Sequence, residues 1–150
     1  MSLAMSKAER EAFLAETHVA VISVADPGRG PLTIPIWYAF EPGGDVRFVT
    51  GGASRKAALI RAAGRLSLCA QTEVAPYRYV SVEGPVTVGT PDFERDIRQM
   101  ARRYLGAEMG EMYLQMTADE RARAANVLVR LKPERWLSVD YGKMAVTAGA

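Results

Sequence analysis

The chain has 150 residues, of which 49% are hydrophobic and 24% charged, a composition typical of a folded domain rather than a disordered segment. Its net charge of +2 is too small to indicate a nucleic-acid partner, and its apolar runs, such as residues 19–24, are no longer than a strand. We therefore expect one domain over residues 1–150, without a membrane segment. Because the amino terminus lacks a signal-peptide pattern, we also expect a cytoplasmic location.

The cysteine and histidine content limits the possible metal and redox chemistry. The sequence contains one cysteine, Cys69, and one histidine, His18, which excludes an internal disulfide and a histidine-rich metal centre. No metal site is predicted. Cys69 lies in the apolar run 66–70, where a buried structural thiol is expected.

The first part of the chain predicts a short helix followed by strands. Ser6 and Glu9 have the spacing of a capping box, which predicts a helix to about Thr17. Apolar and β-branched residues over 18–25, 31–40 and 46–50 are separated by turns rich in proline and glycine. Tight turns between successive strands favour an antiparallel meander of these three segments.

The remainder of the chain alternates helices and strands. Ser54 is expected to cap a helix that ends at Gly64, and residues 66–71 and 77–88 read as strands, with a bend at Gly84-Pro85. Thr90 followed by Pro91 predicts the start of a helix that runs to Leu105, and residues 117–120 repeat the capping-box pattern. The charged side chains over 94–103 are expected to form a solvated face. With final strands at 126–131 and 136–141, the fold predicted is α+β, a small antiparallel barrel of six to seven strands with peripheral helices.

One segment indicates a binding site. In residues 48–56, a strand ends at Thr50 and a glycine pair precedes a helix that begins with Ser54, Arg55 and Lys56. Two cations are unfavourable in the first turn of a helix, where the peptide dipoles already place positive charge, and a bound phosphate would offset this. The glycines, Gly51 and Gly52, would let the backbone turn sharply and approach the ligand. The alternative is that both cations are solvated, but residues 46–72 contain no acidic residue, which favours an anion site.

The run FVTGGASRKAALIRAAGRLSLCAQ, followed by YVSVEGPV, resembles the pyridoxamine 5'-phosphate oxidase-like superfamily. The resemblance implies an FMN-binding split-barrel homodimer with cofactor sites at the subunit interface. It also implies roles for individual residues. Those matching the phosphate-binding positions are Thr50, Ser54, Arg55 and Lys56. Those matching positions beside the ring of the cofactor are Ile34, Pro35, Ile36, Trp37, Arg78 and Tyr79.

Departures from the family pattern narrow the activity that the resemblance implies. An arginine expected within residues 33–36 is absent, as is the arginine and histidine pair that binds the pyridoxal substrate, so genuine pyridoxamine phosphate oxidation is not expected. The segments around Ile36-Trp37-Tyr38 and Pro133-Glu134-Arg135-Trp136 are closer to the actinobacterial flavin and deazaflavin branch. Many members of that branch use coenzyme F-420, whose anionic tail would suit a track of basic residues: Arg55, Lys56, Arg61 and Arg65.

The sequence therefore favours an oxidoreductase that uses coenzyme F-420 or FMN on an unknown small organic molecule. A cofactor of this kind performs hydride transfer itself, so no catalytic side chain is predicted. Aromatic candidates for the ring or substrate pocket are Trp37, Tyr38, Tyr77 and Tyr79. The alternative is a non-catalytic protein that carries such a cofactor, or that binds haem or another tetrapyrrole, for which His18 would be the candidate ligand. Nucleic-acid binding is the least favoured reading, and Glu83 with Asp140 is not expected to form a catalytic pair.

Overall fold

The computed structural model describes residues 2–144 and is an α+β structure, as predicted. Its elements, in chain order, are α1 (Lys7–Ala15), β1 (Ala20–Val24), β2 (Leu32–Ile36), β3 (Val46–Gly51), α2 (Arg55–Ala63), β4 (Arg65–Gln71), β5 (Arg78–Gly89), the π-helix η1 (Phe93–Arg98), α3 (Gln99–Met116), α4 (Glu120–Ala125), β6 (Asn126–Leu131) and β7 (Arg135–Asp140).

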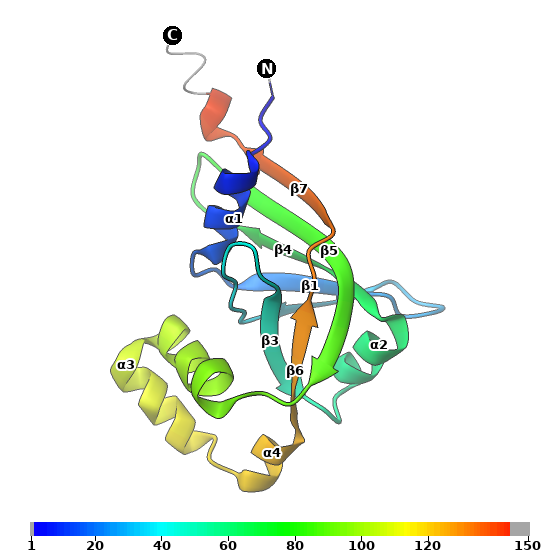
Figure 1. Cartoon of the computed structure of the whole chain (residues 1–150), viewed down its shortest axis with the longest axis vertical. Coiled ribbons are helices and arrows are strands. Elements are labelled where there is room, and N and C mark those ends of the chain that lie inside the picture. Colours follow the sequence, from blue (N-terminus) through cyan, green and yellow to red (C-terminus); the bar gives the residue numbers. More distant parts are fainter. Residues whose placement is uncertain (1, 145–150) are drawn as a thin grey trace.

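The strands form one curled antiparallel sheet of seven strands, which confirms the predicted half-open barrel. The order is β2-β1-β4-β5-β6-β3, and β7 pairs with β5 outside this path. The long strand β5 pairs with β4 and β7 along its first half and with β6 along its second half. Because β5 curves between these partners, around Gly84-Pro85, it joins the two parts of the barrel (Figure 1).

The predicted three-strand meander is only partly right. β1 and β2 form the expected hairpin, but β3 makes only an isolated bridge with the segment after β2, between Ala39 and Arg47. β3 instead pairs along its whole length with β6. The chain leaves the hairpin because Tyr38 is fully buried and its hydroxyl donates to the Leu14 carbonyl, 2.6 Å away, which draws this segment into the core.

The core fills the concave side of the sheet and is closed by α1. Along β1, β3 and β4 every second residue is buried, as expected for strands with one covered face. Phe13 and Leu14 of α1 are 2% and 0% exposed and pack against these residues. The predicted helix ends are confirmed where their signals are local: Ser6 and Glu9 form the capping box, Ser54 caps α2, and Gly64 ends α2 with a φ of 67°.

The helices that follow β5 differ from the prediction. Asp92, rather than Thr90, is the N-cap, and the first turns are a π-helix, η1. The Asp92 N–H donates to the buried Asp96 carboxylate at 2.8 Å. α3 continues past Leu105 but breaks at Gly106, which has a φ of 84°. Its two halves then pack closely, since a Cβ on Gly110 would lie 3.1 Å from the Arg102 backbone.

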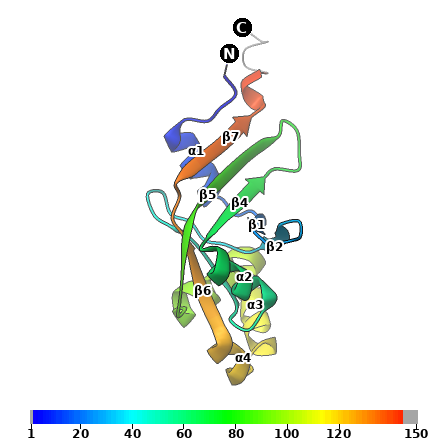
Figure 2. The same cartoon turned by 90° about the vertical axis from the view of Figure 1, so that its right-hand side faces the viewer.

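The second short helix also begins later than expected, because Asp119 caps α4. Figure 2 shows α3 and α4 at one end of the curled sheet and α1 at the other. Within residues 2–144, none of the helices combines the length and apolar character needed to cross a bilayer.

Candidate functional site

A cleft of about 650 Å³ lies between the barrel and the helices α3 and α4. One wall consists of the residue before β1 and the end of β2 with Trp37, and the second of the end of β3 with the start of α2. The third consists of η1, α3, α4 and the first residue of β6. Five of the residues predicted from the sequence line it: Pro35, Ile36, Trp37, Thr50 and Lys56. The cleft therefore brings the predicted ring strand and part of the predicted phosphate motif together.

Trp37 forms an aromatic wall of the cleft. Its ring stacks on Tyr104, with centroids 5.0 Å apart, and lies 5.4 Å from the Tyr113 ring. The Tyr104 hydroxyl donates to the His18 carbonyl at 2.6 Å and accepts the Tyr38 N–H at 3.0 Å. Trp37 therefore packs on Tyr104, whose hydroxyl is fixed by hydrogen bonds to the backbone. Ile34, the other residue predicted on this strand, packs against the core and does not line the cleft.

The loop between β3 and α2 is held by backbone contacts. Ser54 accepts the Ala57 N–H and donates to the Gly51 carbonyl, so its hydroxyl caps the helix. The Gly52 N–H donates to the Ala125 carbonyl at 2.7 Å, and a Cβ on Gly52 would lie 2.5 Å from that oxygen. Gly51 faces open space. The chain turns at residues 52–53, as expected, and the Ser54 N–H donates to the Gly51 carbonyl at 3.1 Å across this turn. Neither glycine has a positive φ, so Gly52 is required for close approach to α4 and not for its backbone conformation.

The four basic residues predicted to form an anionic-tail track have different surroundings in the structure. Lys56 lines the cleft, is half-buried, and forms no hydrogen bond or ion pair within residues 2–144. Burial lowers the pKa of its ammonium group. Arg55 is 53% exposed and pairs with Asp26 in the β1–β2 turn. Arg61 donates to the Gly52 carbonyl and Arg65 pairs with Glu134, so Lys56 alone of the expected track lines the cleft.

The two candidates on β5 lie elsewhere. The Arg78 guanidinium stacks over the Phe13 ring at 4.9 Å and lies 3.7 Å from the Glu16 carboxylate. Tyr79 is half-buried and pairs with Val139 in the sheet. Neither residue lines the cleft.

The residues considered for other chemistry do not converge. His18 stacks on Phe13 at 4.4 Å and its Nε2 lies 3.2 Å from Glu16, outside the cleft. Glu83 and Asp140 lie at opposite ends of the β5–β7 pairing, as expected for residues that are not a catalytic pair. Cys69 is half-buried on β4 rather than fully buried. No group of three or more potential metal ligands from cysteine, histidine and carboxylates occurs within residues 2–144.

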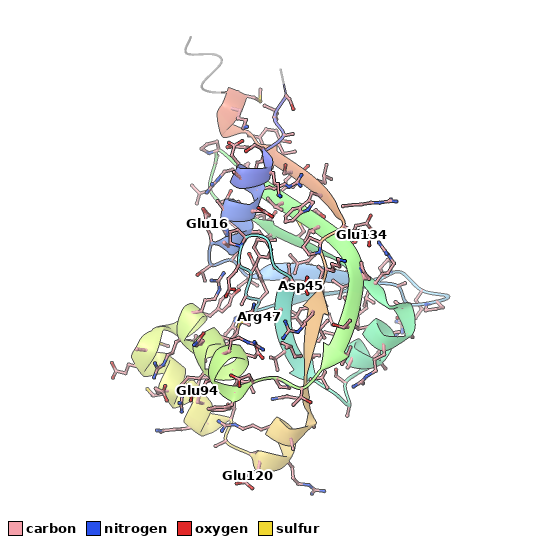
Figure 3. The ribbon with its side chains drawn as sticks, in the orientation of Figure 1. Glu16, Asp45, Arg47, Glu94, Glu120 and Glu134 are labelled. Carbon is pink, nitrogen blue, oxygen red and sulfur yellow. The ribbon has the colours of Figure 1, made fainter. Side chains whose placement is uncertain are left out.

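Asp96 is a buried carboxylate that the sequence pattern placed in a solvated face. Its side chain is 1% exposed, pairs with Arg95 at 2.9 Å, and lies 3.5 Å from the guanidinium of Arg47. Arg47 comes from β3 (Figure 3). Burial alone would raise the pKa of Asp96, but hydrogen bonds from Arg95 and the Asp92 N–H, with the charges of Arg95 and Arg47, lower it. Because a π-helix does not follow the spacing of an α-helix, the charge pattern could not show which side is buried.

Five further cleft residues come from the stretch between the second half of α3 and the start of β6: Tyr113, Thr117, Ala122, Arg123 and Asn126. Tyr113 follows the break at Gly106, and Arg123 and Asn126 lie at the end of α4, so their position depends on how the two helices fold back on the barrel. A cation near the end of a short helix and an amide at the start of the next strand give no local sequence signal for a site. The sequence analysis accordingly assigned them no role.

Comparison with known proteins identifies the family. The model of the pyridoxamine 5'-phosphate oxidase family matches residues 6–140. The chain belongs to this family. A search of curated proteins finds no match for the chain.

Solved structures agree with the assignment to the pyridoxamine 5'-phosphate oxidase family. The conserved hypothetical protein Rv2991 of Mycobacterium tuberculosis is 25% identical with a TM-score of 0.76, covering 95% of this chain and 89% of its own. An F420 reductase is 18% identical with a TM-score of 0.61, covering 85% and 94%. A FAD-binding protein of Mesorhizobium loti is 19% identical with a TM-score of 0.62, covering 89% and 93%. The last two comparisons show a shared fold.

Proposed function

We propose that the protein is an oxidoreductase that uses FMN or coenzyme F-420, with the cofactor phosphate bound at Lys56 and Thr50. The observation that carries this proposal is the half-buried Lys56 ammonium, which lines the cleft without a partner among residues 2–144. Thr50 is 7% exposed and lines the same wall. A phosphate there would meet a cation, a hydroxyl and the free N–H groups at the start of α2, a favourable combination for an anion.

The cleft fits a cofactor of this kind in size and polarity. Its volume of about 650 Å³ lies within the range of small-molecule sites, roughly 300–1,000 Å³. Its lining is apolar toward Ile36, Trp37 and Val49, which suits a flat ring system. The carboxylate in the cleft, Asp96, is already paired with Arg95 and Arg47, so it does not neutralise Lys56.

The relatives support the choice of cofactor. Two proteins that share this fold are an F420 reductase and a FAD-binding protein. When bound, a flavin or deazaflavin would supply hydride transfer, and the protein would hold and orient it. Lys56 and Thr50 would fix the phosphate end, while Pro35, Ile36 and Trp37 would exclude water beside the ring. The segment from Ser54 to Arg55 would act indirectly, by capping α2 and by tying its start to Asp26.

A second copy of the chain is proposed to cover the outer face of the sheet. The pairing registers align Pro35, Val21, Cys69, Ser81 and Leu137 in one row across five strands, named here the outer row. Val21 and Leu137 are 39% and 61% exposed, and neighbouring Val19 is 55% exposed. Pro35 is exposed as well, and Cys69 and Ser81 are half-buried. A row of uncharged, partly exposed residues on one face of a sheet is typical of an interface. Because Pro35 and Val19 also line the cleft, a homodimer on this face would close it.

The test of the phosphate site is a titration of purified protein with FMN, riboflavin and coenzyme F-420, followed by fluorescence. Replacing Lys56 removes a charged hydrogen-bond donor worth about 1.5–3 kcal/mol, so Lys56→Ala is expected to weaken FMN binding about 10- to 100-fold. Riboflavin, which lacks the phosphate, is expected to bind both forms equally. Lys7→Ala, at an exposed lysine on α1, is the matched control. Equal FMN affinity in wild type and Lys56→Ala would refute the phosphate site.

Turnover distinguishes an enzyme from a protein that only carries the cofactor. The oxidoreductase is expected to accelerate oxidation of the reduced cofactor when a suitable small organic acceptor is added. A carrier would bind the cofactor with the same dependence on Lys56 and leave the rate of oxidation unchanged. No observation favours haem, since His18 lies outside the cleft.

A further inference from the structure

Arg123 provides the cleft with a second cation, from a different element than Lys56. It lies on α4, one helical turn before Asn126, where β6 begins. Asn126 is the register partner of Gly51, and the Ala125 carbonyl accepts the Gly52 N–H. The end of α4 is therefore tied directly to the loop that precedes Lys56, and both cations line one cleft.

The Arg123 head group is held in place without a carboxylate. One of its Nη atoms donates to the Leu114 carbonyl at 2.6 Å, and the guanidinium stacks over the Phe93 ring at 4.8 Å. Among residues 2–144 no acidic side chain pairs with it: Asp119 caps α4, and Glu120 points away from the body of the molecule (Figure 3). A guanidinium has five N–H donors, so most of them are free for a ligand.

The charges of the cleft are unbalanced. Lys56 and Arg123 both line it, and Asp96, the acidic residue among its lining side chains in residues 2–144, is taken by Arg95 and Arg47. Two like charges in a partly buried space repel each other unless an anion lies between them. The two cations together can therefore neutralise a ligand with two negative charges, which Lys56 alone could not.

We propose that Arg123, with the Asn126 amide beside it, is a second anchor for the anionic end of the ligand. Arginine binds phosphate and carboxylate oxygens through two parallel N–H groups, whereas lysine acts as a point charge. The cleft therefore selects ligands whose tail is at least dianionic, such as a phosphate monoester or a phosphodiester with carboxylates. This inference rests on the proposed function and extends it to a residue outside the Ser-Arg-Lys motif.

The test compares Arg123→Met with Arg121→Met, an exposed arginine on the same helix that does not line the cleft. Arg123→Met is expected to weaken FMN binding at least tenfold and riboflavin binding less than twofold, and Arg121→Met is expected to change neither. Arg123→Lys is expected to recover part of the FMN affinity. Unchanged riboflavin binding separates a lost anion contact from a distorted cleft.

A second variant keeps the test decisive when Arg123→Met does not fold. Asn126→Asp adds a negative charge at a half-buried position of the cleft, and it is expected to weaken FMN binding much more than riboflavin binding. Wild-type FMN affinity in Arg123→Met, or in Asn126→Asp where only that variant folds, overturns the inference.

The same titrations distinguish this inference from the proposed function. Weakened binding in Lys56→Ala with wild-type affinity in Arg123→Met refutes the role of Arg123 and leaves the proposed function intact. Wild-type FMN affinity in Lys56→Ala with weakened binding in Arg123→Met refutes the phosphate contact of Lys56 and supports Arg123 as an anion anchor. Wild-type protein that binds neither FMN nor coenzyme F-420 refutes both.

Discussion

Arg55 and Lys56 show that two neighbouring cations can have different environments and therefore different roles. Arg55 and Lys56 follow one another at the start of α2, yet Arg55 pairs with Asp26 on the surface while Lys56 lines the cleft. Successive helical side chains point about 100° apart, so the two cannot both face one narrow site. The Ser-Arg-Lys motif thus combines a helix cap at Ser54, a surface ion pair at Arg55 and one cation that lines the cleft, Lys56.

Asp96 is a charged residue that lines the cleft but whose ion pairs give it a structural role. Asp96→Asn is expected to lower the free energy of unfolding by about 2 kcal/mol at neutral pH, because the Arg47 and Arg95 charges beside it would lose their partner. The pKa of Asp96 is lowered in the folded protein, so its contribution is present above the unfolded value of 3.8 and is lost as the pH falls through the folded value.

Urea unfolding of wild type and Asp96→Asn at several pH values measures this contribution. The stability difference is expected to be constant near neutral pH and to shrink below pH 3.8. Glu94→Gln, at an exposed carboxylate in the same helix, is the control (Figure 3). A difference that grows as the pH falls would show that the Asp96 carboxylate is protonated in the native state.

The loop between β3 and α2 shows how one element positions another. Gly52 touches the Ala125 carbonyl at the end of α4, whereas Gly51, its neighbour, faces open space. Gly52→Ala is expected to push the loop from α4, lowering the free energy of unfolding by about 1–3 kcal/mol and weakening FMN binding. Gly51→Ala is expected to change the stability by less than about 1 kcal/mol. Thermal unfolding and FMN titration of both variants check this, and equal effects would contradict it.

The α3–α4 segment is the element that completes the cleft. The break at Gly106 lets the second half of α3 fold back, which brings Tyr113 to Trp37 and Arg123 close to the start of β6. The barrel alone would leave Lys56 on an open surface. The helices therefore contribute an aromatic wall and a second cation.

At the scale of the whole molecule, the outer row of the sheet is the surface on which the proposed dimer can be tested. Val21→Arg places a charge in the middle of this row, and it is expected to convert the proposed dimer to a monomer, since burying an unpaired charge costs several kcal/mol. Light scattering after size-exclusion chromatography measures the mass. Val74→Arg is the control, because Val74 is 78% exposed and lies outside the row. A wild-type monomer, or a Val21→Arg dimer, would contradict the interface.

The sequence by itself determined the features that depend on neighbouring residues. The Ser54 cap, the Gly64 helix end and the alternating burial along β4 each depend on residues close together in the chain, and they are confirmed. The family that the motifs resembled is confirmed as well. Tertiary structure alone decided that β3 pairs with β6, that Asp96 is buried in a π-helix, and that Arg123 shares a cleft with Lys56. These outcomes follow from contacts between distant segments, whose free energies depend on packing and on desolvated charge rather than on local propensity.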